Sequence, residues 1–359
     1  MNQNDGSEII RALDELQKEK GISKEILLEA IEAALVSAFK KHYGTSQSVR
    51  VGIDPLTGNV LVMNRRTVVD EVTDPKSEVA LEEAQHIDPN YQLGDVIENE
   101  VTPREFGRIA AQTAKQVVVQ RIREAERGML YEQFSNREGD VVTGTVSRVD
   151  QRNVVMDLGK TEATLPPQEQ ITVETYSPGQ RMKLYVVEVR KTNRGPMVVV
   201  SRTHPGLLKR LLELEVPEIA EGVVEIKGIA REAGGRSKVA VVAHDPNVDP
   251  VGSCVGPRGT RIQAIVSELA GEKIDVVPWS EDYSAFIASA LSPAKVVEVR
   301  PDFISKVALV VVPDYQLSLA IGREGQNARL AAKITGWKID IKSESQVGLG
   351  GIPRFEIDF

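Results

Sequence analysis

One pattern occurs twice in the C-terminal half of the chain, each time between two helical segments: a glycine, two further residues and a second glycine. The first copy is VGPRGTRI (255–262) and the second is IGREGQNA (321–328). Around each copy the sequence follows the same order of helix, strand, strand, helix, loop, helix and strand. The matching glycines lie 66 residues apart: Gly256 with Gly322, and Gly259 with Gly325. Such a repeat predicts two copies of one small domain.

The residue types of the repeated loop suit a phosphate ligand. Glycine lacks a Cβ, so its backbone adopts positive φ and lets a sugar–phosphate chain come close. The helix after each loop presents free N–H groups and a partial positive charge. The pattern resembles the KH module of type II, whose GXXG loop holds about four nucleotides of RNA. We therefore expect RNA contacts from these residues: Gly256, Pro257, Arg258, Gly259 and Arg261 in the first copy, and Gly322, Arg323, Glu324, Gly325, Gln326, Asn327 and Arg329 in the second.

The two copies differ in charge. Glu324 puts an acid into the second loop, so we expect the first loop to hold phosphate more tightly. The connection between the copies (280–295) is short, and tethering makes the second contact intramolecular. The two loops should then form one surface for about eight nucleotides. The alternative is that both loops are tight turns between helices with no ligand.

Residues 139–202 contain about five short alternating strands, separated by turns such as DQRN, SPGQ and NRGP. Such strands predict a small closed barrel of the OB type. The strand starts and the closing VVVSR resemble the S1 RNA-binding domain. Tyr185 is the one aromatic candidate in the barrel strands for stacking on a base. We therefore expect this barrel to contact RNA chiefly through basic side chains: Lys183, Arg190, Lys191, Arg194 and Arg202.

The first 138 residues combine helical and strand patterns. SKEILLEAIEAALVSAFKKHYG (23–44) has apolar residues at three- and four-residue spacing, with Ser23 as N-cap and Gly44 as C-cap. Alternating strands follow, broken by the turn PLTG. A second helical pattern covers 113–134 and predicts a long helix that joins this α/β unit to the barrel.

Composition limits the chemistry and the partners. With 41% hydrophobic and 27% charged residues, the 359-residue chain is typical of a soluble globular protein. Its longest apolar run, Val307 to Val312, is too short to span a membrane, and the N-terminus lacks a secretion signal, so we expect a cytoplasmic protein. A single cysteine, Cys254, and four scattered histidines predict neither a disulfide nor a metal site.

Charge is unevenly distributed along the chain. The net charge is −8, and residues 1–138 carry 17 basic and 24 acidic side chains, a net of −7. Residues 181–210 carry eight basic side chains and one acid, a net of +7. A local basic stripe of this kind can hold phosphates on a chain that is acidic elsewhere. The alternative is an ordinary solvated surface.

The order of these modules resembles the NusA family of bacterial transcription elongation and termination factors, over essentially the whole chain. The most specific stretches are TVVDEVTDP (67–75), TAKQVVVQRIREAER (113–127), LLELEVPEIAEGVVEIKGIARE (211–232) and DPVGSCVGPRGTRIQAIVSELAGEKIDVV (249–277). The resemblance implies a multidomain α+β fold. Its parts are an N-terminal α/β domain with a long linker helix (1–138), an S1-type OB barrel (139–202), two tandem type II KH domains (203–279 and 280–346) and a tail (347–359).

The resemblance also implies partners and a function. RNA polymerase is the partner expected for the N-terminal domain, with Arg104 and Arg108 facing the polymerase or its RNA exit channel. The alternative for these two arginines is ordinary surface charge at a junction between a strand and a helix. The barrel and KH domains are expected to hold nascent single-stranded RNA and so to modulate pausing, termination and, with other antitermination factors, antitermination. A monomer is expected. No nucleophile–base pair, P-loop lysine or paired carboxylates stand out, so we expect neither an enzyme nor a cofactor.

Two other classes of protein share some of these modules. Phosphorolytic exoribonucleases carry KH and S1 domains, but there the KH domain precedes S1 and a large catalytic core precedes both. The 138 residues ahead of the barrel leave little room for such a core. A ribosome-associated RNA-binding protein is the other alternative, and it would be expected to be basic, unlike this chain.

Overall fold

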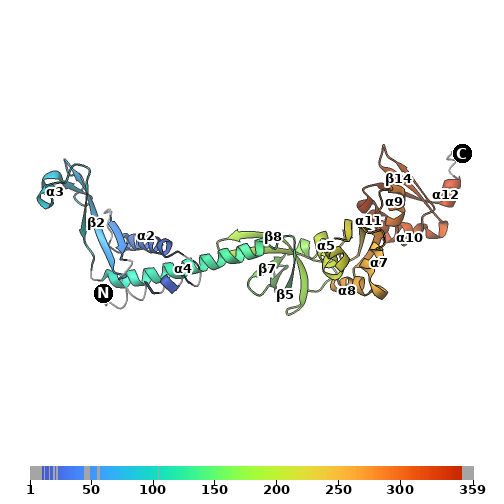
Figure 1. Cartoon of the computed structure of the whole chain (residues 1–359), viewed down its shortest axis with the longest axis horizontal. Helices are drawn as coiled ribbons and strands as arrows, with labels where there is room; N and C mark the ends of the chain where they lie inside the picture. Colours follow the sequence, from blue (N-terminus) through green and yellow to red (C-terminus); the bar gives the residue numbers. More distant parts are fainter. Residues whose placement is uncertain are drawn as a thin grey trace. The chain divides into compact units, whose positions relative to one another are not determined.

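The computed structural model describes residues 10–11, 13–15, 17–18, 21, 23–43, 49–54, 57–103 and 105–349. Gly44, Arg104 and the first two residues of the predicted turn PLTG lie outside the described residues, as does the end of the tail. The chain divides into two compact units, Met1–Met129 and Leu130–Phe359 (Figure 1). Among the described residues, no helix has the length and apolar content that a membrane span requires.

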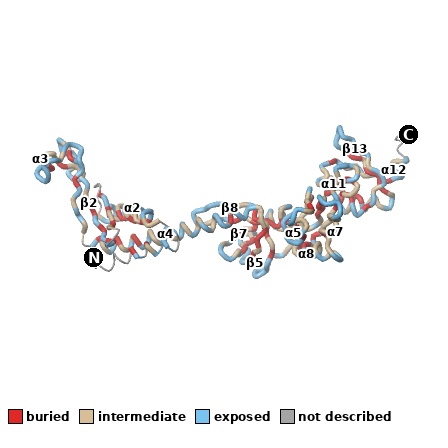
Figure 2. The backbone as a smooth tube through the Cα atoms, in the orientation of Figure 1, coloured by how far each residue is buried: buried red, intermediate tan, exposed pale blue. Residues whose placement is uncertain are grey.

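The first unit packs helices against a small twisted sheet. Its elements are α2 (Lys24–Tyr43), β1 (Val49–Ile53), β2 (Val60–Val69), β3 (Glu78–Ala80), α3 (Leu81–Ile87), β4 (Val96–Glu100) and most of α4 (Phe106–Ser135). In the sheet β2 pairs antiparallel with β1 and β4, and parallel with β3. The helix predicted after Ser23 is confirmed as α2, which buries every fourth residue: Leu27, Ile31, Leu35 and Phe39 (Figure 2).

Helix α4 is longer than its sequence pattern indicated. It begins at Phe106 rather than Thr113, because Phe106 and Ala110 are buried in the apolar core that α2 and β1 also line. Its last turns supply Phe134 to a different core, that of the barrel. The helix therefore contributes to both units.

The barrel opens the second unit. Its elements are β5 (Val141–Asp150), β6 (Asn153–Asp157), β7 (Glu162–Leu165), the short η1 (Pro167–Glu169), β8 (Arg181–Thr192) and β9 (Gly195–Ser201). The five strands close in the order β5, β6, β7, β9, β8, which confirms the predicted barrel. Alternate residues of each strand point inward, and Met156, Leu165, Leu184 and Val198 are fully buried there. Side chains rather than a channel fill the interior, as expected for so few strands.

The repeated segments form two domains with one topology. The first contains α5 (Pro205–Glu215), α6 (Pro217–Ala220), β10 (Val224–Glu232), β11 (Arg236–Ala243), α7 (Pro250–Val255), η2 (Pro257–Gly259), α8 (Thr260–Glu268) and β12 (Lys273–Pro278). The second contains α9 (Tyr283–Ala290), β13 (Glu298–Asp302), β14 (Val307–Val312), η3 (Asp314–Gln316), α10 (Leu317–Ile321), η4 (Arg323–Gly325), α11 (Gln326–Thr335), β15 (Lys338–Ser343) and α12 (Glu344–Leu349).

Each of these domains has a three-stranded sheet with an antiparallel pair followed by a parallel strand. In the first, β11 pairs antiparallel with β10 and parallel with β12. In the second, β14 pairs in the same way with β13 and β15. The repeat seen in the sequence is therefore a repeat of fold.

The two repeated domains pack against each other through apolar side chains. Phe286 of α9 and Val277 of β12 are buried in a small cluster that Ile334 of α11 also joins. Gly228 of β10 brings the first sheet close to α11, because an added Cβ would lie 3.5 Å from Ile334. These contacts fix how α11, and the loop before it, sit beside the first domain.

Candidate nucleic-acid interface

The loops 256–259 and 322–325, called here the first loop and the second loop, have the same backbone. Gly256 and Gly322 adopt φ/ψ of 75°/171° and 76°/169°. Arg258 and Glu324 adopt 54°/25° and 53°/25°, a left-handed conformation that is uncommon outside glycine. The two closing glycines, at 76°/15° and 74°/12°, agree equally well. The backbone groups of the two loops therefore present one geometry, whatever the side chains are.

The first glycine of each loop is required by space as well as by conformation. A Cβ on Gly256 would lie 2.7 Å from Cγ of Arg261, and a Cβ on Gly322 would lie 2.8 Å from the backbone nitrogen of Asn327. The closing glycines have no atom within 4 Å of such a Cβ. Only their positive φ calls for glycine. The first glycine thus sets how closely the loop approaches the helix that follows.

Each loop ends at the N-terminus of a helix without a side-chain cap. Gly259 and Gly325 are the N-caps of α8 and α11, and neither helix has a side chain that accepts from its first N–H groups. These N–H groups carry the positive end of the helix dipole. The N–H group of the first helical residue, Thr260 or Gln326, donates to the carbonyl of Pro257 or Arg323. The positive end of the helix dipole still attracts a phosphate, as at other helix N-termini.

The two cations of the first loop differ in exposure, because Arg258 is exposed and Arg261 is partly buried in an ion pair. Arg258 is exposed and makes no salt bridge with any described residue. Arg261, in contrast, donates from Nη1 to Glu218 Oε2 (2.9 Å) and to the carbonyl of Ser253 (2.7 Å). We expected both as phosphate contacts. In the structure, Arg261 instead connects α8 to α6 and α7 through these two hydrogen bonds.

A pocket opens beside the first loop. It is bounded by the loop after β11, by α7 and by the loop itself, and its lining residues include Asn247, Asp249, Ser253, Gly256 and Pro257. The ion-paired side chains of Glu218 and Arg261 line the same pocket. Sequence analysis missed Asn247 and Asp249, because only their position beside the glycine connects them with the loop.

In the second loop the two middle side chains are the exposed ones. Arg323 and Glu324 are 94% and 84% exposed, with Nε and Oε1 3.9 Å apart, so the acid partly offsets the neighbouring cation. Asn327 was also expected to contact RNA, but it is 3% exposed and donates to the carbonyls of Leu291 and Ala320. Asn327 therefore holds the loop inside its own domain.

Gln326 and Arg329, the remaining residues expected to contact RNA, face the first KH-like domain instead. Arg329 donates from Nε and Nη2 to the two carboxylate oxygens of Glu232, at 2.5 Å and 3.1 Å. Gln326 donates to the same carboxylate at 3.0 Å. Hydrogen bonding to Arg329 holds the pKa of Glu232 below its ordinary value. Both side chains are therefore engaged by Glu232, and that of Arg329 remains 49% exposed.

The basic residues expected on the barrel fall into two groups. Arg190, Lys191 and Arg194 are exposed around the turn between β8 and β9, where Arg190 pairs with Glu188 at 2.5 Å. Lys183 is half-buried on β8. These four residues could reach a phosphate.

Arg202 is different, because it is 2% exposed and its whole guanidinium is engaged. It pairs with Glu174 of the barrel and with Glu268 of α8, and it donates to the carbonyls of Lys183 (2.7 Å) and Glu268 (2.7 Å). Contrary to the sequence-based prediction, Arg202 is not a surface cation. It joins the barrel to the first of the two repeated domains.

Tyr185 is also used within the protein. Its ring stacks on His204, with centroids 4.4 Å apart and planes at 7°. A Cβ on Gly206 would lie 2.5 Å from the ring, so α5 packs directly over it. The ring face expected to stack on a base is therefore occupied by a side chain.

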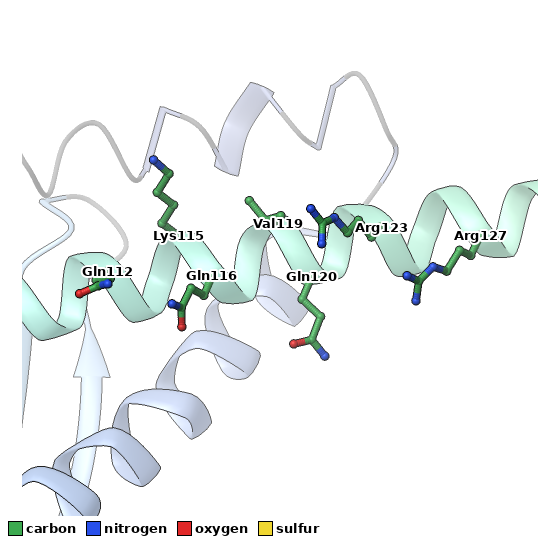
Figure 3. A pocket seen from close by; sticks show the side chains of 7 residues that line it. All are labelled: Gln112, Lys115, Gln116, Val119, Gln120, Arg123 and Arg127. Atoms are coloured by element: carbon green, nitrogen blue, oxygen red, sulfur yellow. The ribbon is translucent and has the colours of Figure 1, made fainter. Parts of the chain in front are cut away.

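In the first unit, a cationic groove follows α4. It is lined by residues in two rows four apart: Lys115, Val119, Arg123 and Arg127 in one, and Gln112, Gln116 and Gln120 in the other (Figure 3). Lys115 and Arg123 form no ion pair with a described residue. Arg108, the described member of the predicted polymerase contacts, is exposed in the first turn of the same helix. The cations Lys115, Arg123 and Arg127 are spaced by eight and four residues, a spacing that could have revealed this groove from the sequence.

The described residues offer no alternative site built on metal or thiol chemistry. No group of three His, Cys, Asp or Glu among them is placed to bind a metal ion. Burial raises the pKa of the Cys254 thiol to about 11, which leaves it protonated at neutral pH.

Comparison with known proteins agrees with this architecture. Family models match the NusA N-terminal domain (residues 8–128), the S1 RNA binding domain (135–201), the NusA-like first KH domain (202–279) and the NusA-like second KH domain (283–348). The transcription termination/antitermination protein NusA of Bacillus subtilis (strain 168) is 60% identical over 349 residues, which cover 97% of this chain and 94% of that protein. The chain belongs to the NusA family.

Two further relatives extend this assignment. NusA of Halalkalibacterium halodurans is 59% identical, with 95% of this chain and 89% of the relative covered. NusA of Thermus thermophilus is 48% identical, with 92% and 89% covered. The S1 domain precedes both KH domains, as in the NusA family and unlike the exoribonuclease order considered above.

Proposed function

We propose that this chain is a cytoplasmic, monomeric transcription factor that binds RNA polymerase and nascent single-stranded RNA, and thereby modulates pausing, termination and antitermination. The observation that carries the proposal is the pair of loops with one backbone, each ending at an uncapped helix N-terminus. Membership of the NusA family supports the link to transcription. We propose neither a cofactor nor a catalysed reaction for this chain.

RNA would be held by the backbone first and by side chains second. A phosphate at each loop would lie at the positive end of the α8 or α11 dipole, and Arg258 would add a cation at the first loop. A base next to that phosphate would enter the pocket lined by Asn247 and Asp249. Arg190, Lys191 and Arg194 would extend the path over the barrel. The first loop should therefore contribute more than the second.

The N-terminal domain would supply the contact with the polymerase. Its candidate residues are Arg104 and Arg108, together with the cations Lys115 and Arg123 of the α4 groove. Partners in antitermination would act on the complex of protein, polymerase and RNA. The protein would then alter pausing by binding one state of that complex more tightly than another.

The test uses three matched variants of the full chain. The loop-1 variant combines Pro257→Asp with Arg258→Asp, and the loop-2 variant combines Arg323→Asp with Glu324→Asp. Aspartate tolerates the left-handed conformation of the second position and repels phosphate. The control variant, Ser305→Asp with Lys306→Asp, places the same pair of acids in an exposed turn where Lys306 also has positive φ (52°).

The measurement is single-round transcription by purified bacterial RNA polymerase on a template with a hairpin pause. The wild-type chain should lengthen the pause, the control variant should act like wild type, and the combined loop-1 and loop-2 variant should lose most of the effect while still binding polymerase. An unchanged pause with the wild-type chain, despite measurable RNA binding, would favour a role on the ribosome or in RNA processing.

A further inference from the structure

A carboxylate of the first KH domain reaches the second loop across the domain boundary. Glu232, the last residue of β10, accepts two hydrogen bonds from Arg329 and one from Gln326, all on its two carboxylate oxygens. Gln326 is the residue that directly follows the second loop. Glu232 is half-buried and 97 residues from Arg329 in the sequence, so only the packing of the two domains brings them together.

Arg329 also forms a hydrogen bond to the second loop itself. While Nε and Nη2 bind Glu232, Nη1 donates to the carbonyl of Glu324 at 3.2 Å. One guanidinium thus joins a carboxylate of the first domain to the backbone of the second loop. The fork of an arginine suits this use, because its donors lie in one plane at fixed angles.

The first loop has a comparable arginine, but its partner belongs to the same domain. Arg261 of α8 binds Glu218 of α6 and the Ser253 carbonyl of α7. Removal of the second domain would leave that arrangement in place. The second loop differs, because the acid that orients its arginine comes from the preceding domain.

We propose that Glu232 is a positioning residue through which the first KH domain holds the second loop in its phosphate-binding conformation. Glu232 does not touch RNA, and it acts by orienting Arg329 and Gln326. The inference rests on the proposed role of the loops in holding phosphate. It predicts that the second loop binds RNA well only while the first domain is docked against it.

The experiment measures the affinity of the full chain for a fluorescein-labelled, unstructured 12-nucleotide RNA. Glu232→Ala is placed in the loop-1 variant, where binding depends on the second loop, and in the loop-2 variant, where it does not. We expect a loss of about tenfold in the loop-1 background, in the usual range for coupling between sites. In the loop-2 background the loss should be below about twofold. Glu232→Gln, which keeps one carbonyl acceptor, should lose less than Glu232→Ala.

Two controls separate positioning from general damage. Glu225→Ala removes an acid of the same strand that pairs with Lys227 within the first domain, and it should leave both affinities unchanged. In a double-mutant cycle, Glu232→Ala should have a clearly smaller effect once Arg329→Ala is present, because only the hydrogen bond from Gln326 to Glu232 is then left to lose. Tryptophan fluorescence during urea unfolding reports whether the KH domains of each variant remain folded.

Each result decides one point. Equal losses in the two backgrounds, or no loss in the loop-1 background, would overturn the positioning role. A gain of affinity there would overturn it as well, and would mean that Glu232 withholds Arg329 from the RNA. If the loop-2 variant binds RNA as tightly as wild type, the proposed function of the second loop is wrong. If the loop-2 variant loses affinity as expected but Glu232→Ala has no effect, only the positioning role of Glu232 is wrong.

Discussion

The first and second loops adopt one backbone but take their support from different places. The arginine behind the first loop, Arg261, binds an acid of its own domain, whereas Arg329 behind the second binds Glu232 of the preceding domain. Their exposed side chains also differ, since Arg258 occupies the position of Glu324. A duplicated loop can therefore keep its geometry while its charge and its dependence on a neighbour change.

The two loops share a backbone conformation that depends on glycine, and the largest effect is expected when the first glycine of a loop is replaced. Gly256 and Gly322 lie in a region of φ/ψ that is nearly closed to other residues, and an added Cβ would strike the following helix. We expect Gly256→Ala or Gly322→Ala to lower the free energy of unfolding by about 3 kcal/mol, from backbone strain together with overpacking. The closing glycines should cost about 1 kcal/mol, from left-handed strain alone.

Urea unfolding followed by tryptophan fluorescence measures this difference. The only two tryptophans of the chain, Trp279 and Trp337, lie next to β12 and β15, so the signal comes from the two KH domains. Gly259→Ala and Gly325→Ala are the matched controls. Equal losses at the first and closing glycines would contradict the role assigned to close packing.

The two loops differ in the charge of their exposed side chains, and this difference should appear in their contributions to RNA affinity. We expect the loop-1 variant to weaken binding of the 12-nucleotide RNA about 30-fold and the loop-2 variant about 15-fold, since only the first loop presents an unopposed cation. Fluorescence anisotropy at a fixed salt concentration measures both, with the Ser305→Asp, Lys306→Asp variant as control. A larger loss from the second loop would reverse the ranking of the two sites.

Local sequence patterns were sufficient for the backbone of these sites but not for their side chains. The order of elements, the five-stranded barrel and the paired loops follow from periodicity and glycine spacing, which act over a few residues. Arg202 and Arg329 were expected as free cations, yet their acids lie 28 to 97 residues away in the sequence. Nothing in the local pattern distinguishes a cation that faces solvent from one that joins two domains.

Tyr185 and Asn327 illustrate the same limit with uncharged groups. An aromatic residue on a barrel strand and an amide beside a phosphate loop are both reasonable contacts for RNA. The tyrosine is covered only because α5 starts at Pro205 beside it, and the amide is buried only because α9 ends near it. Such facts depend on how domains pack, which one sequence without its fold does not reveal.

A single substitution should make the second loop more like the first. Glu324→Arg removes the acid that opposes Arg323 and puts a cation where Arg258 lies in the first loop. We expect RNA affinity to rise about threefold in the loop-1 background, and the salt dependence of binding to steepen by about 0.7 in log–log slope for the added phosphate contact. Titration between 50 mM and 200 mM salt measures both quantities. Glu324→Gln, which removes the acid without adding a cation, separates relief of repulsion from a new contact.

The smallest effect that we expect is in the pH dependence of stability, and it comes from the ion pair between Glu232 and Arg329, which only the second loop has. Because Arg329 lowers the pKa of Glu232, the ion pair adds stability that is fully present above the unfolded pKa of about 4.3 and is lost as the pH falls through the lower, folded pKa. Wild type should therefore be more stable than Glu232→Gln at pH 7, and the difference should shrink toward zero only below about pH 4. Urea unfolding of both proteins from pH 7 to pH 3.5 measures this difference, with Glu225→Gln as the control for an acid in the same strand. If the gap closes already between pH 7 and pH 5, a group other than Glu232 controls the contact, and the second loop depends on the first domain through its apolar packing instead.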